Sequence, residues 1–256
     1  MVIRNFKDKL SDKSVSVGSW ITLANNGIAE IFANAGFDWL VIDLEHSVIS
    51  IDQAGDLIRT IDACGVPALV RLTSNDRNQI KRILDAGANG IVVPNINSAQ
   101  EAESAVASTR YPPRGRRGVG LARAQKYGSG FDDYLNWQED GLVVLVQIEN
   151  CLALDHLDEI FSVDGVDGFI VGPYDLSCSM GIPGDFDHPD FKAAMSSILA
   201  ASARTGCPPG IHSVEPNVSA IEEALENGFK LIAYSADIRI LDVGARQGVN
   251  FLLRKQ

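Results

Sequence analysis

The sequence lacks three features that would each indicate a particular class of protein: a long apolar run, paired cysteines and an excess of positive charge. No stretch of about 18 consecutive apolar residues occurs, so no membrane-spanning helix is predicted. The net charge of −11 argues against broad binding to nucleic acid or anionic membranes, because both require a positive surface. The four cysteines form no CxxC motif, which is typical of structural thiols in a reducing compartment. The segment Met1–Leu10 is charged without an apolar stretch behind it, so we expect no signal peptide and a cytoplasmic protein.

Length and composition fit one globular domain. The chain has 256 residues, of which 46% are hydrophobic and 21% charged. These shares are close to globular averages, so a sizeable core can be buried. Single α/β barrels need about 250 residues. We therefore interpret residues 1–256 as a single domain.

A repeated unit runs along the chain: a helical segment ends in glycine, and a short apolar run follows. Glycine just past a helix end adopts the left-handed conformation that stops a helix, so each glycine predicts a helix-to-strand turn. The apolar runs are continuous rather than alternating, which is typical of strands covered on both faces in a parallel sheet. The five turns are Ala35-Gly36, Cys64-Gly65, Ala86-Gly87, Thr205-Gly206 and Asn227-Gly228.

Eight apolar runs predict eight strands with helices between them. Such alternation forms right-handed βαβ units, and eight units close into an α/β fold of the (β/α)8 or TIM barrel type. The alternative is an open doubly wound sheet, but no GxGxxG motif opens the first unit and no linker divides the chain. We expect strands near residues 15–22, 38–43, 67–72, 90–95, 142–148, 168–172, 208–212 and 230–235, and helices that include 76–85, 99–108 and 216–226.

A long insertion, residues 110–140, follows the fourth unit. It begins with four arginines within residues 110–118 of an otherwise acidic chain. Such a basic loop suits a small anionic ligand or a contact between subunits better than a polynucleotide.

Active sites of these barrels lie at the carboxyl ends of the strands, so polar residues there are the candidates. Glu149 and Asp175 follow the predicted fifth and sixth strands, which are neighbours. Two carboxylates are hard oxygen ligands that suit Mg²⁺ or Mn²⁺, with water and substrate completing the coordination. The alternative is that both merely cap the helices that follow, since aspartate is a good N-cap.

Two further candidates follow the second and third strands. Arg71 ends an apolar strand, and a buried guanidinium needs an anionic partner. That partner is a carboxylate or enolate of a substrate or, alternatively, Asp43 or Glu45. Histidine is the residue type best suited to general acid or base catalysis near neutral pH, so His46 is a candidate, although a lone histidine is more often structural.

Lysine is missing where one class of aldolase requires it. An aldolase that works through a Schiff base needs a buried lysine at the barrel mouth. None of the lysines in the sequence ends a predicted strand, and Lys230 begins one. This favours catalysis by a metal.

Five separated segments resemble the HpcH/HpaI aldolase family, which includes 4-hydroxy-2-oxoheptanedioate and 2-dehydro-3-deoxyglucarate aldolases. The resemblance covers nearly the whole chain, in the same order. The segments are Gly36–His46, Val70-Arg71, Gly115–Arg123, Gln147–Glu149 and Val171–Ser177.

The resemblance implies a class II pyruvate aldolase, in which a divalent metal cleaves a 4-hydroxy-2-oxo acid into pyruvate and an aldehyde. The metal is Mg²⁺, Mn²⁺ or Co²⁺, bound by Glu149 and Asp175. It further implies that Arg71 stabilises the enolate and that His46, paired with Asp85 and near Asp43, is the acid/base group. Asp85 ends a helix, an unfavourable place for an anion, which fits a functional role. The substrate-binding residues it implies, together with those at the strand ends, are Arg71, Gln147, Gly172, Tyr174, Arg123 and Ser213.

Two positions depart from the family pattern and affect the expected specificity for the aldehyde. Tyr174 is bulkier than the small residue common there and would tighten the pocket near the metal. His212-Ser213 ends the seventh strand where apolar residues are expected.

Family members form hexamers built as trimers of dimers that exchange the last helix. The apolar tail Leu241–Leu253 suits that part.

Two other functions fit the same residues. One is a related carbon–carbon lyase or decarboxylase that acts on oxaloacetate or a CoA ester through the same enolate. The other is a non-catalytic protein that binds a metal or a 2-oxo acid.

Overall fold

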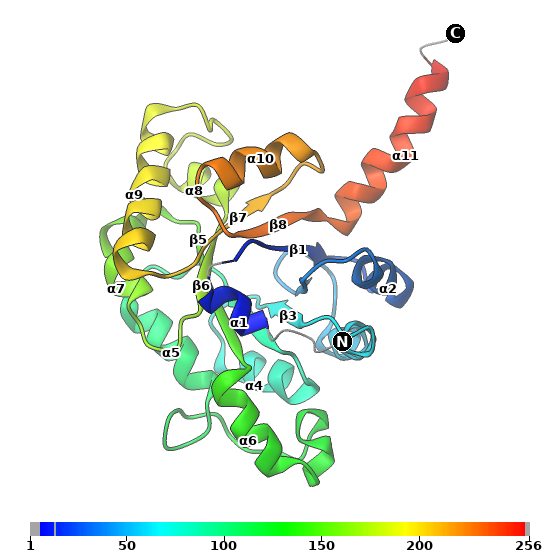
Figure 1. The fold of residues 1–256 in the computed structure, drawn as a ribbon, viewed down its shortest axis with the longest axis vertical. Helices are drawn as coiled ribbons and strands as arrows, with labels where there is room; N and C mark the ends of the chain where they lie inside the picture. The colour runs from blue at the N-terminus through cyan, green and yellow to red at the C-terminus, as the bar shows by residue number, and fades with distance from the viewer. Residues whose placement is uncertain (1–5, 13, 254–256) are drawn as a thin grey trace.

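The computed structural model describes residues 6–12 and 14–253, and its centre is a closed barrel of eight parallel strands (Figure 1). Each strand pairs with the next in the chain, and β8 pairs with β1 to close the ring. The predicted (β/α)8 barrel is therefore confirmed, and the open sheet is wrong. The strands are β1 (Ser16–Ile21), β2 (Trp39–Asp43), β3 (Ala68–Arg71), β4 (Gly90–Val93), β5 (Val143–Ile148), β6 (Gly168–Val171), β7 (Pro209–Ser213) and β8 (Leu231–Ala236).

Helices alternate with the strands and cover the barrel from outside. The glycines that follow α2, α3, α4, α9 and α10 have positive φ angles, as the predicted helix-to-strand turns require. The helices are α1 (Phe6–Ser11), α2 (Asn26–Asn34), α3 (Ile51–Ala63), α4 (Arg77–Ala86), α5 (Ala99–Thr109), α6 (Phe131–Asp140), α7 (Leu157–Phe161), α8 (Pro173–Ser179), α9 (Pro189–Thr205), α10 (Val218–Glu226) and α11 (Asp237–Leu253), with the short 3₁₀ segments η1 (Arg123–Gly128) and η2 (Cys151–His156).

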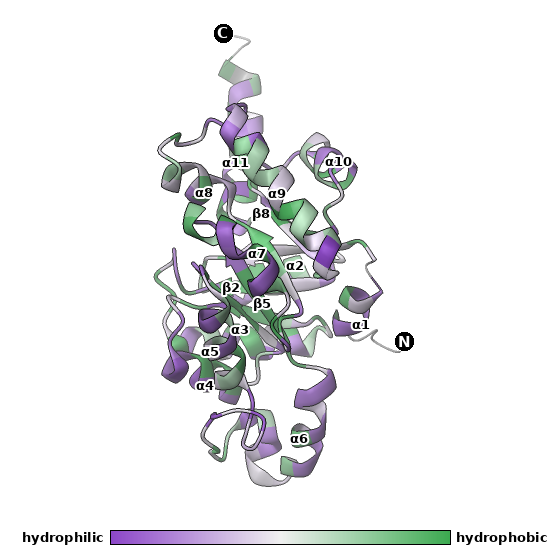
Figure 2. Cartoon of the chain, turned by 90° about the vertical axis from the view of Figure 1, so that its left-hand side faces the viewer, coloured by the Kyte–Doolittle hydropathy of each residue, from purple (hydrophilic) through white to green (hydrophobic). Residues whose placement is uncertain are grey.

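The amino end of the barrel is plugged by apolar side chains. Phe6 and Leu10 of α1 belong to the same buried cluster as the inward-facing side chains of the strands. The ring of Phe6 lies 5.7 Å from that of Trp39, whose indole Nε1 donates to Ser16 Oγ at 3.0 Å. The strands form the hydrophobic centre of the molecule (Figure 2). Because this end is filled, polar chemistry is confined to the carboxyl ends of the strands.

Two segments extend beyond the barrel. The insertion after α5 carries η1 and α6, and α11 projects away from the other elements (Figure 1). Several apolar side chains of α11 are exposed: Ile238, Leu241, Val243, Val249, Phe251 and Leu253. Within residues 6–12 and 14–253, no helix is both long and apolar enough to cross a membrane.

Candidate active site at the carboxyl end of the barrel

Arg71 and Asp43 end the neighbouring strands β3 and β2 and are paired in the barrel register. Arg71 donates from Nε and Nη2 to the two carboxylate oxygens of Asp43 at 2.8 and 2.7 Å. Both side chains are buried. Burial raises the pKa of Asp43, but the hydrogen bonds and charge of Arg71 outweigh it and hold that pKa below its usual value. The alternative partner predicted for Arg71 is therefore present, yet the pair uses only two of the three guanidinium nitrogens.

The third nitrogen of Arg71 faces the mouth of the barrel. Its Nη1 lies 3.3 Å from Glu45 Oε2. The guanidinium also stacks on Trp20, with its central carbon 4.4 Å from the ring centroid. The His212 ring packs against the same indole, with centroids 5.3 Å apart. Arg71 is thus held by Asp43 and Trp20, and its Nη1 pairs with the carboxylate of Glu45 at the mouth.

Glu149 and Asp175 come together at the same end of the barrel. A side-chain carbon at Gly172 would lie 2.9 Å from Glu149 Oε2 and 3.6 Å from Asp175 Oδ2, so both carboxylates approach one point. Glu149 Oε1 accepts from the backbone N–H of Asn95 at 2.7 Å, and Oε2 accepts from Gln147 Nε2 at 2.6 Å. These bonds fix the orientation of the Glu149 carboxylate, and glycine at position 172 keeps the space beside it open.

Helix capping does not account for these two acids. The side chain that caps η2 is Asn150, which accepts from the N–H of Leu152. The N-cap of α8 is Gly172, and Asp175 lies inside the first turn of that helix. The predicted alternative of two simple caps is therefore wrong.

A third carboxylate, that of Glu45, lies close enough to interact electrostatically with Glu149 and Asp175. Burial raises the pKa of Glu45 to about 7; the charges of Asp43 and Asp175 add to this, while that of Arg71 opposes it. Burial also raises the pKa of Glu149 to about 7, with Glu45 the largest charge contribution. Glu45 Oε2 is buried and has no hydrogen-bond partner. The charge of Arg71 only partly offsets these acids, and such an arrangement favours a cation at the mouth.

The donor set fits a hard divalent cation that keeps open coordination positions. Among residues 6–12 and 14–253, no three His, Cys, Asp or Glu side chains lie close enough to hold a metal by themselves. Glu149 and Asp175 would therefore supply two ligands and leave the remaining positions to water and substrate.

His46 and Asp85, expected to pair, lie at opposite ends of the barrel. His46 follows the end of β2, with its side chain 63% exposed and Nε2 3.8 Å from Glu45 Oε2. Asp85 is in the last turn of α4, which runs about 15 Å from the carboxyl end of β3 back toward the amino end of β4. Its Oδ1 instead accepts from Arg117 Nη2 at 2.6 Å. Pairing within one chain is therefore wrong, and Arg117 already compensates the charge of Asp85 at the helix end.

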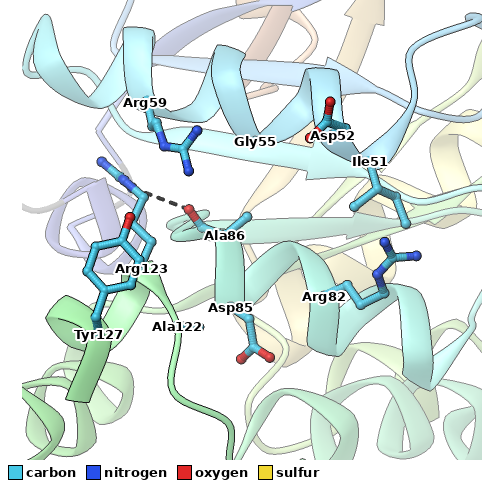
Figure 3. A pocket seen from close by; sticks show the side chains of 10 residues that line it. All are labelled: Ile51, Asp52, Gly55, Arg59, Arg82, Asp85, Ala86, Ala122, Arg123 and Tyr127. Atoms are coloured by element: carbon cyan, nitrogen blue, oxygen red, sulfur yellow. Dashed lines mark hydrogen bonds between the residues drawn. The ribbon is translucent and has the colours of Figure 1, made fainter.

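Arg123 belongs to the group around Asp85 and not to the barrel mouth. It donates to Asp62 Oδ2 at 2.6 Å and to the carbonyl of Ala86 at 3.4 Å. Figure 3 shows the pocket of about 380 Å³ that this residue and Asp85 line between α3, α4 and η1. A role of Arg123 in shaping the mouth of its own chain is therefore wrong.

Three other predicted substrate-binding residues lie at the mouth. Gln147 is the last residue but one of β5 and Ser213 ends β7, and Gln147 Oε1 and Ser213 Oγ are buried without hydrogen-bond partners. Tyr174 follows Gly172 and packs edge-to-face on Phe186, with ring centroids 5.0 Å apart. The Tyr174 ring therefore packs against the loop after α8. This contact gives no evidence that Tyr174 narrows the pocket near Glu149 and Asp175.

The arginine run of the insertion is mostly used inside the chain. Arg114 pairs with Glu139, and Arg116 donates to Ser104. Arg117 is fully buried. The contacts of Arg116 with α5 and of Arg117 with α4 fix the insertion to the barrel, whereas that of Arg114 stays within the insertion. These three arginines thus already have partners inside the chain.

Sequence reasoning did not assign a site role to Glu45 or Trp20. Glu45 is two residues after Asp43, and alternate positions leaving a strand point to the same side. Trp20 stands in β1 beside small residues and fills the space under Arg71. The position of Glu45 could have been recognised from the sequence near Asp43. The position of Trp20 under Arg71 depends on how β1 packs beside β2 and β3.

Comparisons with known proteins show the family to which the chain belongs. The family model for HpcH/HpaI aldolase/citrate lyase matches residues 16–241. A 4-hydroxy-2-oxo-heptane-1,7-dioate aldolase from Salmonella dublin is 40% identical over 242 residues, 94% of this chain and 91% of the relative.

Two solved structures share the whole fold. An HpcH/HpaI aldolase/citrate lyase family protein from Burkholderia cenocepacia J2315 superposes with a TM-score of 0.91 at 35% identity, covering 96% of this chain and 98% of that one. An HpcH/HpaI aldolase from Desulfitobacterium hafniense DCB-2 has a TM-score of 0.88 at 31% identity, covering 96% and 95%. The fold and these likenesses define a carbon–carbon lyase built on a (β/α)8 barrel. The chain belongs to the HpcH/HpaI aldolase/citrate lyase family.

Proposed function

We propose that this protein is a class II pyruvate aldolase, which reversibly cleaves a 4-hydroxy-2-oxo acid into pyruvate and an aldehyde. The observation that carries the proposal is the convergence of Glu149 and Asp175 beside Gly172, with Arg71 Nη1 beside Glu45 at the same end of the barrel. The 40% identity to an enzyme that is named 4-hydroxy-2-oxo-heptane-1,7-dioate aldolase supports this substrate class.

Glu149 and Asp175 would hold Mg²⁺, Mn²⁺ or Co²⁺. When bound, such an ion supplies positive charge against the negative charge that develops on the keto oxygen of the substrate. Gln147 and the N–H of Asn95 keep the Glu149 carboxylate oriented. These contacts are made before the substrate arrives, so little reorganisation is needed at the moment of reaction.

Arg71 acts on the same developing charge from another side. Asp43 and Trp20 hold the guanidinium in place, and Nη1 carries positive charge toward the mouth. A buried guanidinium stays protonated at every physiological pH, so it stabilises an anion without itself transferring a proton. Asp43 is therefore a positioning residue for Arg71.

His46 is the proton-transfer group in this proposal. It is exposed at the carboxyl end of the barrel, and its Nε2 lies 3.8 Å from Oε2 of Glu45. Because Asp85 lies at the far end of the same barrel, a carboxylate role for Asp85 toward His46 requires a second copy of the chain. The active site is then completed between subunits.

The exposed apolar face of α11 also suits association of copies. It carries Leu241, Val249 and Leu253, whose side chains are exposed in the described chain. We expect this helix to pack on a neighbouring subunit, as in an exchanged dimer, and a hexamer of three such dimers to form.

The alternative within this family is a lyase or decarboxylase that acts on oxaloacetate or a CoA ester. Arg71 and the carboxylate pair act on the 2-oxo acid half of a substrate, so they would also stabilise the charge formed when oxaloacetate loses carbon dioxide. No aldehyde-binding group is needed for that reaction.

Pyruvate release from a panel of 4-hydroxy-2-oxo acids tests the substrate class, with oxaloacetate included. Turnover of a 4-hydroxy-2-oxo diacid at catalytic rates (about 1 s⁻¹ or faster) is expected, with oxaloacetate slower. Turnover of oxaloacetate alone would favour the decarboxylase, and no turnover of either would contradict the proposal.

A further inference from the structure

Arg117 is a fully buried cation that forms an ion pair with the partly exposed carboxylate of Asp85. Its side chain has no exposed area, and its Nη2 donates to Asp85 Oδ1 at 2.6 Å. Nη1 donates to the hydroxyl of Tyr134 at 2.8 Å. The guanidinium lies over two rings, with its central carbon 4.9 Å from the Tyr111 centroid and 5.4 Å from that of Tyr134. Three interactions besides the ion pair thus fix this one group.

Asp85 itself is only partly covered. Its side chain is 22% exposed and lines the pocket between α3, α4 and η1 (Figure 3). Arg117 holds Oδ1, whereas Oδ2 faces Gly120, where an added side-chain carbon would lie 3.8 Å away. One oxygen is therefore anchored from inside, and the other lies beside a residue without a side chain.

We infer that Arg117 is the positioning residue of Asp85: it fixes the carboxylate from the interior so that Oδ2 can accept a hydrogen bond from a donor on a second copy of the chain. The donor is the imidazole of His46, so the inference rests on the proposed function. An exposed ion pair gains little, because two long side chains must be ordered in water. Here the arginine is already ordered by Tyr111 and Tyr134, so the carboxylate is held at small further entropic cost.

A purely structural role is the competing interpretation, because Arg117 also ties the insertion to α4. The two interpretations differ in how Arg117 and Asp85 combine. If Arg117 acts through Asp85, replacing Arg117 has no further effect on kcat once Asp85 has been replaced. If Arg117 only supports the fold, replacing it lowers kcat by the same factor whether or not Asp85 is present.

The test is a double-mutant cycle on the full-length protein, with Arg117→Met, Asp85→Asn and the combined variant. We expect Arg117→Met to lower kcat about 10- to 100-fold with little change in KM, as a misplaced catalytic group does. We expect the combined variant to match Asp85→Asn. Mn²⁺ affinity, measured by calorimetry, should be the same in all four proteins because Glu149 and Asp175 are untouched.

Two further variants keep the test decisive if Arg117→Met unfolds. Tyr134→Phe removes one hydrogen bond from the guanidinium and keeps the burial, so it should lower kcat by a smaller factor and lose that effect in the Asp85→Asn background. Arg114→Met is the matched control, because Arg114 lies in the same insertion but is exposed and pairs with the half-buried Glu139. It should leave kcat unchanged.

Each result bears on a different claim. Losses that multiply in the combined variant, or wild-type kcat in Arg117→Met when Asp85→Asn is inactive, would overturn the positioning role alone. Wild-type kcat in Asp85→Asn would overturn the role of Asp85 in the proposed function and this inference with it.

Discussion

Asp43 occupies two nitrogens of Arg71, Nε at 2.8 Å and Nη2 at 2.7 Å, whereas Nη1 lies 3.3 Å from Glu45 Oε2. The bidentate pair with Asp43 leaves Nη1 to other anions, so it is compatible with an arginine that also stabilises a substrate anion. A guanidinium has a fixed fork geometry, so binding one carboxylate on one edge orients the remaining nitrogen. Lysine at this position would provide charge without that orientation.

Arg71→Ala should abolish most aldol cleavage while metal binding is retained. Removing one preorganised group that stabilises the developing charge costs about 100- to 1000-fold in kcat. The variant also leaves Asp43 buried without its partner, which destabilises the protein by about 3–5 kcal/mol, so Tm must be measured alongside. Arg204→Ala, which breaks an exposed pair with Asp158, is the control and should have wild-type kcat. Wild-type turnover in Arg71→Ala would mean that the enolate role is wrong.

Loss of both predicted metal ligands should eliminate metal binding. Glu149→Ala combined with Asp175→Ala removes the two carboxylates that converge beside Gly172. Calorimetric titration with Mn²⁺ should then show no saturable site at the mouth. Asp187→Ala combined with Asp190→Ala removes the same number of charges from the exposed surface and should bind normally. Full occupancy in the first double variant would refute the site.

His212 should stay neutral well below the usual range for histidine. Burial lowers its pKa to about 4, with the charge of Arg71 adding to the effect. A folded-state pKa below the unfolded value of 6.5 means that the unfolded chain binds more protons between those values. The stability from a neutral His212 is thus complete above pH 6.5 and is lost as pH falls toward 4, on the order of 3 kcal/mol.

His212→Gln should remove that pH dependence. The free energy of unfolding, measured by denaturant titration between pH 4 and 7, should fall less steeply in the variant than in the wild type. His156→Gln changes an exposed histidine and should leave the slope as it was. A ring proton resonance of His212 that titrates near pH 6.5 would contradict the assignment.

Mixed oligomers test whether Asp85 serves His46 of another copy. His46→Ala and Asp85→Ala should each be inactive alone. After dissociation and joint reassembly, random mixing gives about a quarter of the sites an intact histidine from one copy and an intact aspartate from the other. Activity near that fraction of wild type is expected. If the reassembled mixture stays inactive while wild-type protein treated the same way recovers, the shared site does not exist.

The fold could be predicted from sequence because its signals are local. The turns at Gly36, Gly87 and Gly228 and the continuous apolar runs are each readable within a few residues, and alternation then leaves few topologies. Helix α6 of the insertion and the 3₁₀ segments η1 and η2 have no comparable local sequence pattern, so the sequence did not predict them. Their conformation depends on contacts such as Arg117 with Tyr134, which join residues far apart in the chain.

The sequence could predict only those site residues that lie at or just after the ends of strands. Arg71 and Asp43 end β3 and β2, Glu149 directly follows β5, and Asp175 lies in the helix that follows β6, so the order of strands and helices already places them at the carboxyl end of the barrel. Asp85 stands just before the Ala86-Gly87 turn, so barrel polarity already puts it at the amino end, although the family resemblance pairs it with His46. The packing of Trp20 on His212 required barrel closure between β8 and β1, which no local pattern encodes.

The measurement that tests the central claim most directly is pyruvate release from the best 4-hydroxy-2-oxo acid before chelation, after exhaustive chelation, and after Mg²⁺, Mn²⁺ or Co²⁺ is added back. The account predicts that chelation abolishes release and that at least one of these ions restores it in the wild type but not in Glu149→Ala combined with Asp175→Ala. Release that survives complete removal of metal would contradict the account.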